Sequence, residues 1–158
     1  MKKLVSRLLR VALIVILLAS VLAQVLVPVY ASEVGARFPE VAHLVVPYSV
    51  AAILFIGCGQ AALLAIWQLL SFVDGGVIFT RRAVRWVDVI VTCGAVATIL
   101  TAVVLVHMLG FVPSGGGPMV YYLGACIAAG LAFVLLMVVM RGLLLAAVAD
   151  RAELDAVI

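Results

Sequence analysis

The amino-acid sequence predicts an all-α integral membrane protein, a bundle of four transmembrane helices with both ends of the chain in the cytoplasm. Hydrophobic residues make up 68% of its 158 residues and charged residues only 11%, against about 45–50% and about 25% in soluble domains. So few charged side chains cannot cover the surface of a water-soluble fold of this length. Lipid is therefore the expected solvent for most of the chain.

Long uncharged runs place the four helices within a single transmembrane domain, residues 1–158. A hydrocarbon core about 30 Å thick needs about 20 helical residues at about 1.5 Å each. The longest run, between Asp88 and Arg141, exceeds one crossing and is divided by the Gly- and Pro-rich segment 113–118. The predicted spans are about 9–31, 43–73, 87–112 and 119–149, with an amphipathic cytoplasmic linker over 74–88.

The basic residues predict which side of the membrane each end of these helices faces. Cytoplasmic connections of membrane proteins carry the excess of Lys and Arg. With four crossings, all but one of the ten basic residues fall on the side of the two termini, which predicts that both termini are cytoplasmic. Because these residues are spread over helix ends rather than gathered on one face, no nucleic-acid partner is expected. Arg37 lies on the far side, opposite Lys2, Lys3, Arg7, Arg10, Arg81, Arg82, Arg85, Arg141 and Arg151.

The first span has an alternative interpretation as a secretory signal. The triplet Val29-Tyr30-Ala31 before Ser32 resembles a small-residue cleavage site. The apolar stretch that precedes it runs about 18 residues to Pro28, beyond the usual length of about 7–15. We therefore expect the first helix to be retained.

The linker over 74–88 is the most informative connection. After a Gly-Gly turn, Thr80 can cap a helix with basic residues on one face and aromatic residues on another. Three arginines beside an anionic leaflet contribute about 1 kcal/mol each. We expect this helix to lie on the bilayer and to contact anionic lipids of the inner leaflet, or a partner, through Phe79, Arg81, Arg82, Arg85 and Trp86.

Two sets of residues predict helix packing. On the second span Ser49, Gln60 and Ser71 recur every eleven residues, so they lie on nearly one face and are expected to point into the bundle. On the fourth span, small residues at spacing four permit close approach of another helix. Packing within the chain is preferred there over a homodimer seam, and the residues are Gly124, Ala128 and Ala132.

No motif for catalysis or metal binding stands out. The central part of each span carries no Asp, Glu, Lys or Arg, whereas a buried ionisable residue is the usual mark of an ion or proton pathway. His43 and His107 lie at similar depths near the outer face and could share a haem iron. Two interfacial histidines that reach headgroups or water are the preferred interpretation, so we expect no cofactor, no metal and no enzymatic activity.

The linker also carries a family resemblance. Gly76 to Phe79 form a G-x-x-F motif, followed by Thr80, a basic helix, an apolar span and the ending 153–158. With the four-helix plan, this resembles the bacterial membrane proteins with "domain of unknown function 2975", although Arg81 and Arg82 stand where family members often carry an acid and an Asn. The resemblance implies a multi-pass protein of the bacterial inner membrane without assigned catalytic residues. Family members are often encoded near small helix-turn-helix regulators, which suggests a regulatory partnership.

The expected function is that of a non-enzymatic membrane protein, a regulatory partner or an accessory or scaffolding subunit of a membrane complex. It would act through helix packing and its basic cytoplasmic linker, on membrane lipids and on a membrane protein partner or a second copy of itself. Two alternatives stay open. One is a haem- or quinone-associated electron-transfer subunit that uses His43 and His107, and the other is a transporter for a neutral solute along the Ser49, Gln60 and Ser71 face.

Overall fold

The protein folds into four long helices. The computed structural model describes residues 2–74, 81–111 and 117–157, and this part of the chain contains helices but no strand. All four long helices are long and apolar enough to cross a membrane. The all-α prediction is confirmed, and the chain is a multi-pass membrane protein. The elements are α1 (Lys2–Arg37), the 3₁₀ helix η1 (Pro39–Leu44), α2 (Val45–Asp74), α3 (Arg81–Phe111) and α4 (Pro118–Val157).

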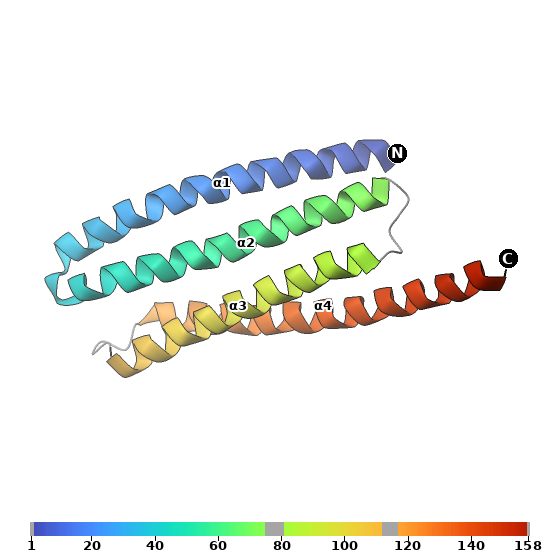
Figure 1. Ribbon diagram of the computed structural model, residues 1–158. Helices are drawn as coiled ribbons and strands as arrows, with labels where there is room; N and C mark the ends of the chain where they lie inside the picture. Colours follow the sequence, from blue (N-terminus) through green and yellow to red (C-terminus); the bar gives the residue numbers. More distant parts are fainter. Residues whose placement is uncertain (1, 75–80, 112–116, 158) are drawn as a thin grey trace.

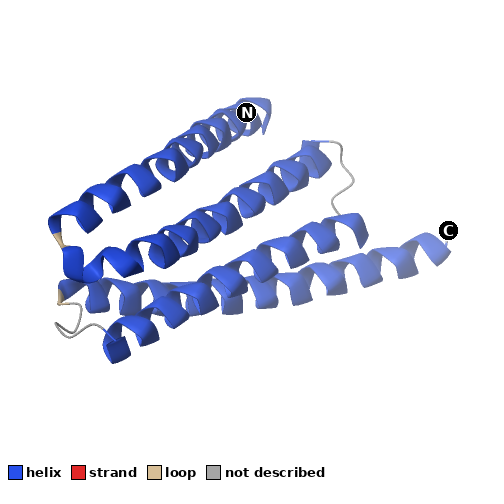
Figure 2. Cartoon of the chain, turned by 60° about the vertical axis from the view of Figure 1, so that its left-hand side comes forward, coloured by secondary structure: helices blue, strands red, loops and turns tan. Residues whose placement is uncertain are grey.

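The helices run antiparallel and pack in chain order. As Figures 1 and 2 show, α1 lies against α2, α2 against α3, and α3 against α4. In the described part of the chain, no two helices that are non-consecutive in sequence bring their backbones close together. The four helices therefore form an open row, in which α1 and α4 are edge helices with one long neighbour each.

The two ends of the row differ in composition. Both termini lie at the same end, together with the end of α2 and the start of α3 (Figure 1). We call this the basic end, because it carries the described side chains of Arg7, Arg10, Arg82, Arg85 and Arg141. The opposite end is called the tyrosine end, and it carries Tyr30, Tyr48, Tyr121 and Tyr122. That the basic end faces the cytoplasm stays a prediction from the positive-inside rule.

Three helices, α1, α3 and α4, extend beyond their predicted spans, whereas α2 nearly matches its span. α1 has 36 residues and α4 has 40, and the latter corresponds to about 60 Å of helix. The flanking residues continue the helix because Lys, Arg, Ala and Leu are strong helix formers and long basic side chains can reach polar headgroups. α3 begins at Arg81 and runs without a break into the third span. The expected surface helix in the linker 74–88 is therefore, from residue 81 onward, the first turns of α3.

The same turns of α3 are the best-packed part of the protein. Within the described residues few side chains are buried, as expected for a row of helices that lipid surrounds on both faces. Ala83, Val84, Val87 and Ile90 are all buried, and they recur at helical spacing on one side of α3. Ala83 and Val87 of the expected surface helix therefore pack inside the protein instead of resting on the bilayer. The other buried residues are Leu13, Leu44, Ala65 and Thr101.

Glycines bring α3 and α4 close together. A Cβ atom on Gly130 would collide with the Thr98 side chain, and one on Gly94 would lie 3.1 Å from the Phe133 ring. Thr98 donates its hydroxyl to the Gly94 carbonyl oxygen at 2.8 Å, so its polar atom is satisfied within α3. The entry to α4 uses Gly117 at φ +49°, a left-handed conformation that glycine adopts without a steric penalty.

Candidate functional site

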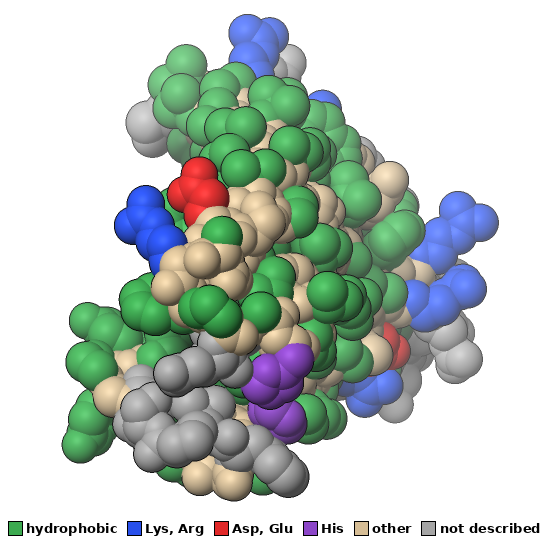
Figure 3. All heavy atoms as spheres, turned by 90° about the vertical axis from the view of Figure 1, so that its left-hand side faces the viewer, with side chains coloured by type: hydrophobic (Ala, Val, Ile, Leu, Met, Phe, Trp, Pro, Cys, Tyr) green, Lys and Arg blue, Asp and Glu red, His purple; other side chains and the backbone are tan. Residues whose placement is uncertain are grey.

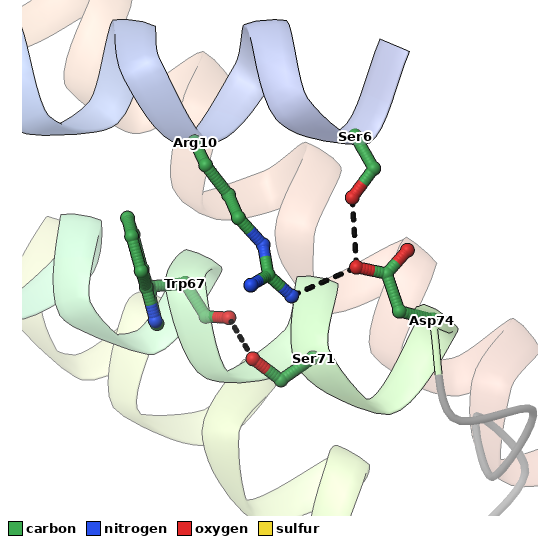
Figure 4. Close-up of polar contacts among 5 residues, drawn as sticks. All are labelled: Ser6, Arg10, Trp67, Ser71 and Asp74. Atoms are coloured by element: carbon green, nitrogen blue, oxygen red, sulfur yellow. Dashed lines mark hydrogen bonds and ion pairs between the residues drawn. The ribbon is translucent and has the colours of Figure 1, made fainter. Parts of the chain in front are cut away.

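At the basic end an ion pair fastens α1 to α2. The Nη2 atom of Arg10 donates to Oδ2 of Asp74 at 2.8 Å, and the Ser6 hydroxyl donates to the same oxygen at 2.7 Å (Figure 4). The Arg10 guanidinium also lies over the Trp67 ring, 5.5 Å from its centroid, within the range of a cation–π contact. Arg10 and Asp74 are 37% and 41% exposed, so water and headgroups still reach the pair.

A second ion pair joins α3 to α4 at the same end. Arg141 donates from Nε to the Asp88 carboxylate. Asp88 follows Arg81 and Arg85 at helical spacing, and its side chain contacts α4. Asp74 and Asp88, which bound the linker 74–88, are thus each held by an arginine of a neighbouring helix. From the sequence, Arg10 and Arg141 were used only to predict the orientation of the helices in the membrane. The order of residues along the chain does not show that an acid lies at the same depth on the next helix.

Three of the five predicted surface residues lie together on α3. Arg82 and Arg85 are exposed, Trp86 is partly buried, and with Val89 they line a hollow of about 270 Å³. Residues 82, 85, 86 and 89 lie on one side of a helix. Phe79 lies outside the described residues, and so does the side chain of Arg81. We call the hollow and its four residues the arginine hollow.

A polar cluster joins α1 to α2 between the two ends. Gln60 Nε2 donates to Gln24 Oε1 at 3.0 Å and to Ser20 Oγ at 3.1 Å. Gln24 Nε2 lies 3.3 Å from the carbonyl oxygen of Ile53, and Ser20 donates to its own helix. Gln60 therefore contacts α1, and its partners on that helix were not predicted. The signal was present in the sequence, since Ser20 and Gln24 sit four residues apart on an otherwise apolar span.

The two serines of the predicted polar face do not extend this cluster. Ser49 donates to the Val45 carbonyl at 2.6 Å, and Ser71 donates to the Trp67 carbonyl at 3.1 Å (Figure 4). Both hydroxyls are satisfied within α2, a common arrangement for Ser in membrane helices. The face that joins Ser49, Gln60 and Ser71 is thus not a continuous polar path, contrary to what the transporter alternative needs.

The small residues of α4 lie away from α3. Ala128 and Ala132 are exposed, and nothing lies within 4 Å of a Cβ built on Gly124. The expected packing within the chain is not seen at these positions, because Gly94 and Gly130 make the close approach between α3 and α4 instead. Spacing alone cannot show which small residues of α4 face α3, since Gly130 lies on the same helix as Gly124, Ala128 and Ala132. We call Gly124, Ala128 and Ala132 the small-residue stripe.

The histidines lie at the tyrosine end, where Figure 3 shows histidine side chains on the end face beside hydrophobic ones. His107 Nδ1 forms a hydrogen bond of 3.0 Å with the Tyr48 hydroxyl, and the two rings meet edge to face at 5.8 Å. This bond ties α2 to α3. His43 is exposed on η1. The described residues contain no group of three or more His, Cys, Asp or Glu that could hold a metal ion.

A large apolar hollow lies near Tyr48, between α1 and α2 at the tyrosine end. It has a volume of about 720 Å³, and aliphatic and aromatic side chains line almost all of it, with Met108 and Met119 at one side. Ser49 is among the lining residues, but its hydroxyl is already bonded within α2. A lining of this composition suits a hydrocarbon chain better than a polar substrate.

Comparison with known protein families identifies a match for most of the chain. Residues 29–158 match the family model described as "Protein of unknown function (DUF2975)". The match covers α2, α3, α4 and the last part of α1, and so includes the arginine hollow, the small-residue stripe and both ion-paired aspartates. No curated protein and no solved structure matches the chain.

Proposed function

We propose that this chain, which belongs to the DUF2975 family, is a non-enzymatic regulatory partner or accessory subunit of a membrane complex in the bacterial inner membrane. In this proposal it binds another membrane protein through α4, while the basic end rests at the cytoplasmic surface. The family description names no activity, so the proposal is built from the described side chains.

The observation that carries the proposal is the small-residue stripe. Without a hydrophobic effect between helices in lipid, close association depends on van der Waals packing, and small residues at spacing four allow two backbones to approach. Gly124, Ala128 and Ala132 have this spacing but face away from α3. α4 is an edge helix, so a helix of another protein can reach this stripe without displacing any element of the chain.

The polar groups of the described chain support the same proposal. The contacts of Gln60, Asp74 and Asp88 all join one helix of the protein to the next. In the part of the chain that the structure describes, every buried polar side-chain atom has a hydrogen-bond partner. These polar groups hold the row of helices together. A protein that binds a partner through its outer surface needs such a fixed arrangement of helices.

Affinity purification of the full chain in mild detergent tests the proposal. We expect a second membrane protein at a stoichiometric ratio. In Ala128→Leu, recovery of this partner should fall about tenfold, because a leucine keeps the partner helix at a distance that removes the close packing. A chain recovered alone, or only with copies of itself, would contradict the proposal.

Cys126→Leu is the matched control. Cys126 is also exposed on α4, and it lies two residues from both Gly124 and Ala128, hence on the other flank of the helix at about 100° per residue. This variant should recover the partner as well as the wild type does. Equal loss in both variants would show that any bulky change on α4 disturbs the complex and that the stripe has no special part.

A further inference from the structure

The arginine hollow of α3 combines two cations with an apolar edge. Arg82, Arg85, Trp86 and Val89 line a volume of about 270 Å³ near the start of α3. Their spacing brings the two guanidinium groups to the same side of the helix, where side chains three residues apart are neighbours. Trp86 adds an amphipathic ring of the kind that membrane proteins place at the level of lipid headgroups.

The two arginines have no counter-ion among the described side chains. Asp74 and Asp88 are the described acids of the basic end, and they are bound to Arg10 and Arg141. Within the same described part, neither Arg82 nor Arg85 forms a hydrogen bond or an ion pair. No acid among the described side chains therefore neutralises the hollow, and its positive charge is available to an anion.

The surface of α3 beyond the hollow shows which anion fits. Continuing from Val89 toward the tyrosine end, exposed apolar side chains follow one another at spacings of three, four and seven residues and so form one face of the helix. Two of them, Ile99 and Val106, are 63% and 69% exposed. A ligand that has its anionic group in the hollow can thus lay a hydrocarbon chain along this face, whose members are Val89, Val96, Ile99, Val103 and Val106.

We infer that the arginine hollow binds the headgroup phosphate of an anionic phospholipid whose acyl chain lies along the exposed face of α3. Arginine suits this role because its planar fork can donate two parallel hydrogen bonds to phosphate oxygens. The inference rests on the proposed function in one respect, because it places the basic end in the anionic cytoplasmic leaflet. The inference names a lipid as the ligand of the arginine hollow. Binding of an acidic segment of a protein partner would be a different outcome of the test.

Native mass spectrometry of the full chain in detergent can measure this binding. Phosphatidylglycerol is the anionic probe and phosphatidylcholine the zwitterionic one. Each arginine near an anionic lipid surface changes the affinity about fivefold, so Arg82→Gln/Arg85→Gln should bind phosphatidylglycerol about 25-fold more weakly than the wild type. Arg82→Lys/Arg85→Lys keeps the charge but loses the fork, and its affinity should fall between the two.

Arg7→Gln is the matched control. Arg7 is exposed at the same end but lies on α1, outside the hollow. If Arg7→Gln weakens binding as much as Arg82→Gln alone does, only the general field of the basic end attracts the lipid and the inference is wrong. Because Arg82 and Arg85 are exposed, the thermal stability of the glutamine variants should match that of the wild type, which checks that they are folded.

Two further binding measurements distinguish a lipid from other anionic ligands. Inorganic phosphate or glycerol 3-phosphate that displaces the bound lipid at equal concentration would identify a soluble phosphate as the ligand and overturn the inference. An acidic peptide that binds the wild type more tightly than phosphatidylglycerol does would overturn it in favour of a protein partner. Because lipid binding is measured on the purified chain alone, its failure is distinguishable from a failure to recover a partner through α4.

Discussion

The contact between α1 and α2 and the contact between α3 and α4 are built in different ways. α1 is held to α2 by hydrogen bonds and an ion pair, through Gln60 in the middle and Asp74 at the basic end. α3 is held to α4 by shape, through Gly94 and Gly130, with one ion pair at the basic end. In the first contact, polar side chains of one helix bond to the other helix. In the second, glycines that lack a side chain let the two helices approach closely.

This difference shows how a small membrane protein can fix a row of helices without a central core. In lipid, apolar side chains gain little from facing each other, so specific association comes from close packing or from polar contacts. Each long-range polar contact on α1 pairs it with α2 alone. The glycines of α3 and α4 fit the Thr98 and Phe133 side chains. These two pairs of helices are thus specified by different contacts, which suits an open row.

The largest expected effect is a break in the contact between α3 and α4. Gly130→Ala places a methyl group against Thr98, and overpacking of this kind costs about 1–3 kcal/mol. The free energy of unfolding can be measured by titration with SDS in mixed micelles. Gly142→Ala is the control on the same helix, because nothing lies within 4 Å of a Cβ built there. Equal destabilisation in both variants would mean that glycine packing does not hold α4 to α3.

A smaller effect is expected between α1 and α2. Gln60→Leu removes two hydrogen bonds to α1, each worth about 0.6 kcal/mol between membrane helices, so the free energy of unfolding should fall by about 1 kcal/mol. Ser71→Ala removes only a bond within α2 and should change it by less than about 0.5 kcal/mol. The same titration checks both variants. If Ser71→Ala costs as much as Gln60→Leu, the polar cluster contributes nothing specific to the pairing of these helices.

The sequence predicted the helices well and their contacts poorly. Hydropathy alone predicted four long apolar helices, because a membrane helix needs little more than an uncharged run of sufficient length. It could not show that Ala83 and Val87 are buried, since a helix face turned to lipid and one turned to protein are both apolar. Gln60 was expected to point inward because a polar amide in lipid needs a partner, and its side chain contacts α1. Its partner Gln24 and the pairing of Asp88 with Arg141 depend on relative helix depth, which one sequence does not contain.

The ion pair between Arg10 and Asp74 provides a third and smaller test. A double-mutant cycle with Arg10→Ala and Asp74→Ala should give a coupling energy of about 0.2–1 kcal/mol, because both side chains are partly exposed. The coupling should decrease with added salt, since screening weakens exposed pairs. Arg7→Ala combined with Asp74→Ala is the control cycle, and it should show no coupling. A coupling between Arg7 and Asp74 as large as that of the true pair would contradict the geometry in Figure 4.

The smallest effect is expected at His43. Its side chain is exposed on η1, so His43→Ala should change the free energy of unfolding by less than about 0.5 kcal/mol. His107→Ala should cost more, because it removes the bond to Tyr48 that ties α2 to α3. A visible spectrum of the purified wild type should show no Soret band before or after addition of dithionite. A band that either substitution abolishes would favour the electron-transfer alternative.

The orientation of the chain tests the central claim most directly, because the lipid site and the regulatory role both place the basic end in the cytoplasm. Alkaline phosphatase, which is active only outside the cytoplasm, can be fused after Ile158 and, in a second chain, after Arg37 at the tyrosine end. The account predicts an inactive reporter after Ile158 and an active one after Arg37. An active reporter after Ile158 would place the basic end outside and contradict the account.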